Sequence, residues 1–156
     1  MANTEGLKHE VEDFVRGELS KRFGVKFEKR RATLTGVQPP PRDHEFDAVA
    51  NDGSIVAGII SSALKTSGGR RNVGAVHHAT GELYYLSLVD AKRRILISVD
   101  PGFHDLMKSV TGGRLGIGLE LLNIELPPEL AELVHRTRLE ASREMSPEKP
   151  TDRTGT

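Results

Sequence analysis

The sequence predicts an α/β domain in which a mixed β-sheet is flanked by helices. Three observations support this fold class. Apolar residues from Leu7 to Phe23 recur at the spacing of an amphipathic helix. An Asp52-Gly53 turn joins two strand-like segments and indicates a β-hairpin. A second helical pattern follows the hairpin, and a helical crossover at this point produces a sheet with both antiparallel and parallel pairs.

The individual elements follow from local signals along the chain. Gly24 ends the first helix as a C-cap residue, and three prolines exclude helix and central strand from residues 36–43. Residues 55–60 are almost all apolar, which is typical of a central strand covered on both faces. Pro127 and Pro128 open the last helix. The predicted elements are a helix over 7–23, a strand over 25–35, hairpin strands over 44–50 and 55–62, a helix over 73–89, a strand over 94–100, a small helix over 103–110, a strand over 119–126 and a final helix that ends near 145.

Length and composition restrict the class of protein. A chain of 156 residues with 37% hydrophobic and 28% charged residues fits one globular domain, predicted over residues 1–145. Residues 146–156 are predicted to form a disordered tail. The absence of Cys excludes disulfides and thiolate metal sites. No stretch is long and apolar enough for a membrane span, so a soluble cytoplasmic protein without membrane contact is expected. Within the helices, Val73 and Leu133 are predicted to face the core.

The positive charge is clustered although the formal net charge is zero. Residues 21–31 contain six basic residues, including Arg30 and Arg31, and one acid. The second cluster consists of Lys65, Arg70 and Arg71, and the third of Lys92, Arg93 and Arg94. Such clusters can bind phosphates if the fold brings them together. The alternative is that they are solvated strand edges and loops.

The hairpin predicts which side chains share a face of the sheet. With residues 51–54 as the turn, Asp47 lies opposite Gly58. Glu45 then lies opposite Ile60. Because side chains alternate along a strand, all four residues are expected on one face. A register changed by one residue would separate Asp47 from Gly58.

The segment HEFDAVANDGSIVAGIISS, within the layout of residues 7–100, resembles the hairpin of the PD-(D/E)xK nuclease superfamily. The resemblance implies the restriction-endonuclease-like fold, with an aspartate on the second strand and an acid-x-lysine on the third around a metal ion. It places Asp47 at the aspartate, Gly58 at the acid and Ile60 at the lysine. Glycine offers no carboxylate to Mg²⁺, and isoleucine stabilises no negative charge. The resemblance therefore implies a nuclease-like domain with an incomplete catalytic site and no cofactor.

The leading functional hypothesis is a non-catalytic domain that associates with nucleic acid or with a protein partner. The expected phosphate contacts are Lys65, Arg70, Arg71, Arg30 and Arg31. A hypothesis from another class is a homo-oligomeric interaction protein, such as a homodimer, without a role in nucleic-acid binding.

A third hypothesis is an active metal-dependent endonuclease whose site residues have migrated to neighbouring elements. Asp47 would then hold Mg²⁺ or Mn²⁺ together with Glu45 or Glu82, and Lys65 would replace the missing lysine. The alternative is that Glu45 and Glu82 pair with arginines at the surface.

Overall fold

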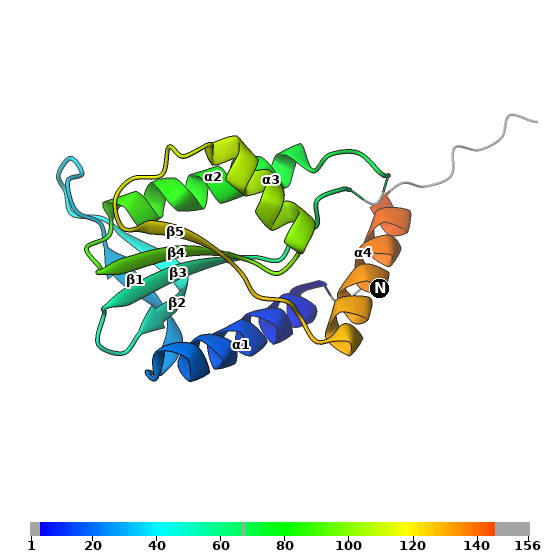
Figure 1. The fold of residues 1–156 in the computed structure, drawn as a ribbon, viewed down its shortest axis with the longest axis horizontal. Helices are drawn as coiled ribbons and strands as arrows, with labels where there is room; N and C mark the ends of the chain where they lie inside the picture. Colours follow the sequence, from blue (N-terminus) through cyan, green and yellow to red (C-terminus); the bar gives the residue numbers. More distant parts are fainter. Residues whose placement is uncertain (1–3, 67, 146–156) are drawn as a thin grey trace, which may run out of the picture.

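The computed structural model describes residues 4–66 and 68–145 and contains one five-stranded sheet in the order β1-β2-β3-β4-β5 (Figure 1). The strands are β1 (Phe27–Thr33), β2 (Asp43–Ala50), β3 (Ile55–Ile60), β4 (Arg93–Ser98) and β5 (Leu119–Asn123). The helices are α1 (Thr4–Phe23), α2 (Val73–Leu88), α3 (Pro101–Thr111) and α4 (Pro128–Met145). Each predicted element is present in the predicted order. The predicted tail lies outside the described residues.

The sheet separates two layers of helices (Figure 1). Helices α1 and α4 pack on one face, where Val11, Val15 and Val134 join the core. Helices α2 and α3 pack on the other face through Leu83, Phe103 and others. We refer to these as the α1 face and the α2 face. No helix of the described residues is long and apolar enough to cross a membrane.

The predicted hairpin and its central strand are confirmed. Strand β3 pairs antiparallel with β2 and parallel with β4, and all six of its residues are buried. The pairs Ala48–Ala57 and Val49–Val56 give the predicted register. At the turn, the Asp52 carboxylate accepts a hydrogen bond from the Ser54 backbone N–H at 3.0 Å. The mixed sheet therefore follows from a hairpin joined to a helical crossover.

Two helical residues that were predicted to face the core are exposed instead. Val73 is 55% exposed, because the buried stripe of α2 runs through Ala75, Ala79 and Leu83. Val73 lies two positions before Ala75, about 200° around the helix from it. Leu133 is exposed as well, while its neighbour Val134 is buried.

Candidate functional site

A β-bulge in β2 decides which side chains of the hairpin can meet. Phe46 and Val49 both pack on the α2 face, although residues three apart on a regular strand point to opposite faces. The β1–β2 register shifts at the same place, between the pairs Glu28–Val49 and Arg30–Phe46. One extra residue of β2 therefore lies opposite Lys29, and the alternation reverses beyond it.

The bulge places Glu45 on the α1 face. Its Oε1 lies 3.7 Å from Lys29 Nζ, and the same Nζ lies 3.8 Å from Oε2 of Glu12 on α1. Glu12 is 1% exposed, and its two carboxylate oxygens form no hydrogen bond with the described residues. Arg16 and Lys8 provide two further cations, at 3.7 and 3.9 Å from Glu12. Lys29 thus bridges two carboxylates, and Glu45 pairs with a lysine rather than with an arginine.

Asp47 is engaged by the backbone of the neighbouring strand. Its Oδ2 accepts a hydrogen bond of 2.8 Å from the backbone N–H of Ile59. Its own carbonyl oxygen accepts a 2.8 Å hydrogen bond from Arg16 Nη1. The two bonds connect α1, β2 and β3 at one residue, so Asp47 has a structural role in this fold.

Gly58 and Ile60 face the opposite side of the sheet from Glu45. Ile60 packs in the core of the α2 face, and a Cβ at Gly58 would lie 3.2 Å from Oε2 of Glu82 on α2. Glu82 Oε1 pairs with His44 Nε2 at 3.3 Å, and the His44 ring stacks on Tyr85 at 3.9 Å. The predicted placement of Glu45, Gly58 and Ile60 on one face is therefore wrong. The register is as predicted, but the bulge reverses the face.

The residues proposed for a migrated metal site do not assemble around one ion. Within residues 4–66 and 68–145, no three His, Asp or Glu side chains are arranged to hold a metal. Glu45 pairs with Lys29, and Glu82 pairs with His44 on the other face. No hydrogen bond or ion pair joins Lys65 to Asp47 in the described structure. The described residues supply neither a metal-binding set of carboxylates nor a lysine beside it.

The first basic cluster is largely neutralised within the fold. Arg31 Nη2 lies 2.7 Å from Asp43 Oδ1, and this hydrogen bond raises the pKa of Arg31 and lowers the pKa of Asp43. Arg30 donates to the backbone carbonyl of Ala50 at 3.1 Å. Lys29 lies between Glu12 and Glu45, as described above. Arg30 and Arg31, predicted as phosphate contacts, are thus occupied by partners within the protein.

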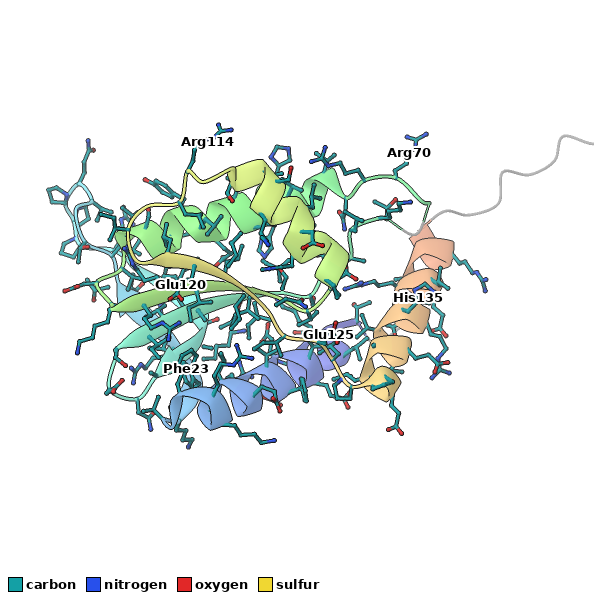
Figure 2. The ribbon with its side chains drawn as sticks, viewed as in Figure 1. Phe23, Arg70, Arg114, Glu120, Glu125 and His135 are labelled. Atoms are coloured by element: carbon teal, nitrogen blue, oxygen red, sulfur yellow. The ribbon has the colours of Figure 1, made fainter. Side chains whose placement is uncertain are left out.

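In the third cluster, the two arginines are occupied by partners within the protein. Arg93 forms two hydrogen bonds with the Glu120 carboxylate, at 2.9 and 2.7 Å, and lies over the Phe23 ring. Arg94 donates to the backbone carbonyls of Leu86 and Ser87. Figure 2 shows Glu120 and Phe23 well away from Arg70, so the second cluster is separate from the region around Arg93.

The second cluster differs because its charges are unpaired. Lys65, Arg70 and Arg71, which we call the basic loop, lie in the connection between β3 and α2. All three are exposed, and none forms a side-chain hydrogen bond or an ion pair with the described residues. Lys65 and Arg71 form an antiparallel backbone bridge, and the Thr66 N–H donates to the Arg70 carbonyl. The backbone thus holds three free cations on one short turn.

A groove borders the basic loop. It has a volume of about 460 Å³ and lies between the loop and helix α4, with Lys65, Thr66 and His135 on its walls. The Asp100 carboxylate, also in its lining, accepts hydrogen bonds from the backbone N–H groups of Leu64 and Phe103. Figure 2 shows Arg70 and His135 at the same end of the molecule. The groove therefore provides a recess beside the free cations.

Sequence reasoning missed two charged residues at inward positions, the buried Glu12 and the half-buried Arg138. Glu12 lies between Val11 and Val15 on the buried stripe of α1, and Arg138 follows Val134 by four residues on α4. The signal that could have identified both residues is their helical spacing from neighbouring apolar positions.

Comparison of the chain with protein-family models, with curated proteins and with solved structures finds no match.

Proposed function

We propose that this chain is a non-catalytic domain that binds the phosphate backbone of nucleic acid through the basic loop. The observation that carries the proposal is the contrast between the three basic clusters. The first and third are occupied largely by carboxylates and carbonyls of the fold. Lys65, Arg70 and Arg71 have no such partner among residues 4–66 and 68–145. In a protein of zero net charge, this loop is a local concentration of free cations.

The chemistry of the loop favours contact with phosphates over recognition of bases. The guanidinium group of an arginine can donate two hydrogen bonds to the oxygens of one phosphate, and the lysine ammonium adds a point charge. No Phe, Tyr or Trp side chain lines the adjacent groove in the described structure, so the groove lacks the large aromatic platforms on which successive bases stack. Binding of this kind is largely independent of sequence and decreases with salt, because each neutralised phosphate releases counterions.

The hairpin supports the non-catalytic part of the proposal. Asp47 is hydrogen-bonded to the backbone of β3, and Gly58 and Ile60 offer no side-chain oxygen or nitrogen. Glu45 and Glu82 lie on opposite faces of the sheet, each with its own partner. Divalent-metal catalysis needs several oxygen ligands at one point, and the described residues do not provide them.

The test is a binding measurement with matched charge reversals. Fluorescence anisotropy with labelled duplex DNA, single-stranded DNA and RNA should show binding at low salt. Arg70→Glu with Arg71→Glu should weaken binding about tenfold or more for all sequences alike. Lys21→Glu with Arg22→Glu changes the net charge equally at the far end of α1 and should have little effect.

Two outcomes would contradict the proposal. Equal weakening by both double variants would show that only the net charge matters. Absence of binding at low salt would favour the homo-oligomeric interaction protein, and sedimentation equilibrium would then report self-association.

A further inference from the structure

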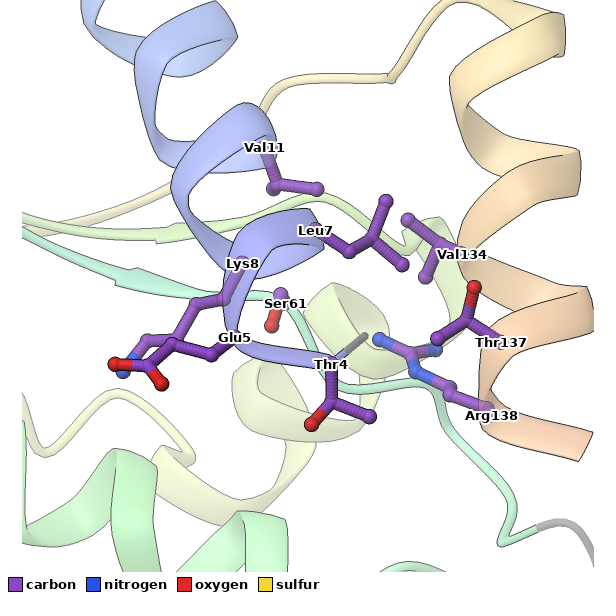
Figure 3. A pocket seen from close by; sticks show the side chains of 9 residues that line it. All are labelled: Thr4, Glu5, Leu7, Lys8, Val11, Ser61, Val134, Thr137 and Arg138. Atoms are coloured by element: carbon purple, nitrogen blue, oxygen red, sulfur yellow. The ribbon is translucent and has the colours of Figure 1, made fainter. Parts of the chain in front are cut away.

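A second recess lies between α1 and α4, next to the end of β3, and it is independent of the proposed function. Its volume is about 370 Å³, within the lower range of small-molecule sites. Leu7, Val11 and Val134 form an apolar wall, and the hydroxyl residues Ser61 and Thr137 also line it (Figure 3). The recess therefore combines apolar surface with a few polar groups.

Arg138 supplies the charge of this recess. Its guanidinium points into the space between α4 and the start of α1 (Figure 3). The residue is half-buried, and no hydrogen bond or ion pair connects it to the part of the chain that the structure describes. Burial lowers the pKa of Arg138, and the charge of Asp100 offsets this only in part. Asp100 itself already accepts two backbone hydrogen bonds.

A partly desolvated cation without a direct partner is unfavourable, and an anion that entered the recess would relieve this cost. The other charged lining residues, Lys8 and Glu5, extend together away from Arg138 (Figure 3). Lys8 pairs with Glu12 at 3.9 Å, so Arg138 is the charged lining side chain that points into the interior. The single cation inside the recess is complementary to a ligand with one negative charge, and the apolar wall is complementary to a hydrocarbon part of that ligand.

We propose that the recess between α1 and α4 binds a small monocarboxylate with a short apolar body, whose carboxylate pairs with Arg138. The hydroxyls of Ser61 and Thr137 are available to the remaining lone pairs of the carboxylate. Leu7, Val11 and Val134 cover the hydrocarbon part. A multiply charged anion such as inorganic phosphate fits less well, because it would leave charge unpaired against an apolar wall.

Octanoate is a suitable probe, measured by isothermal titration calorimetry on the full chain. 1-Octanol tests the need for the charge, and inorganic phosphate tests the need for the apolar body. We expect octanoate to bind at least about tenfold more tightly than either, because a charged hydrogen-bonded pair and the apolar contact are both required.

Variants on the same helix locate the site. Arg138→Gln should weaken octanoate binding about tenfold or more, while Arg136→Gln, which removes an exposed charge two residues away, should change it less than about twofold. Val134→Phe should obstruct the recess and weaken binding without loss of charge. Unfolding midpoints report whether each variant is folded. Arg70→Glu with Arg71→Glu should leave octanoate affinity unchanged, which separates this site from the basic loop.

Several results would overturn the proposal. One is the absence of any heat of binding with octanoate. Another is that octanoate binds no more tightly than 1-octanol, or no more tightly than phosphate. A third is that the Arg138 and Arg136 variants weaken octanoate binding equally. Unchanged affinity in a folded Val134→Phe variant would also reject the recess as the site.

Discussion

The Asp47 carboxylate accepts a hydrogen bond of 2.8 Å from the backbone N–H of Ile59 on the adjacent strand. The bond continues the connection between β2 and β3 beyond the pair Ala48–Ala57, at the point where the bulge interrupts regular pairing. A side chain thus replaces a backbone acceptor for a buried donor. Asp47, which the sequence predicted as the aspartate of a nuclease-like hairpin, is therefore part of the hydrogen bonding of the sheet itself.

Asp47→Ala should lower the free energy of unfolding by about 1–3 kcal/mol, because the buried N–H of Ile59 loses its acceptor. Asp47→Asn keeps an oxygen at this position and should cost less. Urea unfolding of the three proteins measures the difference. An unchanged midpoint in Asp47→Ala would show that water or another group satisfies Ile59 equally well.

Purified protein should leave DNA and RNA intact in the presence of Mg²⁺ or Mn²⁺. The reason is that Asp47 is bonded to β3 and that the described residues provide no group of three metal ligands. A cleavage assay with plasmid, duplex and RNA substrates checks this. Metal-dependent cutting that disappears in a folded Asp47→Ala or Asp47→Asn variant would establish the active nuclease instead.

Gly58→Ala should destabilise the protein by about 1 kcal/mol, because its Cβ would lie 3.2 Å from Oε2 of Glu82. Glu82 cannot move freely, since its other oxygen pairs with His44. The penalty should shrink in a Glu82→Ala background, as measured by a double-mutant cycle in urea. Gly81→Ala on α2 is the control, because its Cβ meets no atom within 4 Å. An equal penalty in both backgrounds would reject the contact with Glu82.

The pair Arg93–Glu120 should make a pH-dependent contribution to stability. The hydrogen bond from Arg93 lowers the pKa of the Glu120 carboxyl, so the contribution is present above the unfolded pKa of about 4.3. It is lost as the pH falls through the lower pKa of the folded state. Because the side chains are 46% and 39% exposed, Glu120→Gln should cost less than about 1 kcal/mol at pH 7.

Urea unfolding of the wild type and Glu120→Gln between pH 7 and pH 2 measures this difference. The two proteins should converge in acid, while Glu125→Gln, on an exposed residue, should match the wild type throughout. A difference that persists at pH 2 would attribute the effect to packing rather than to charge.

Local patterns in the sequence were sufficient to predict the elements and the hairpin register. The Asp52-Gly53 turn and the apolar run of β3 depend on neighbours along the chain, so both were readable. The bulge beside Asp47 could not be predicted, because the β2 segment contains no glycine or other residue that is typical of a bulge. One inserted residue reversed the face of Glu45, and with it the predicted assembly of the site.

The sequence also could not show which basic residues have hydrogen-bond or ion-pair partners within the fold. Arg93 and Glu120 are 27 positions apart and meet only because β4 pairs with β5. The same holds for Arg31 and Asp43, which meet across the β1–β2 pair. The sequence shows three similar clusters, and only the tertiary structure distinguishes the two that are largely partnered from the basic loop.

The salt dependence of nucleic-acid binding tests the central claim most directly. If Lys65, Arg70 and Arg71 contact three phosphates of duplex DNA, the logarithm of the association constant should fall with the logarithm of salt concentration with a slope of about −2.7. Replacing both arginines, Arg70→Gln with Arg71→Gln, should reduce the slope to about −0.9. Lys21→Gln with Arg22→Gln should leave it unchanged. A slope that the Arg70 and Arg71 substitutions do not alter, or no binding at low salt, would contradict the account.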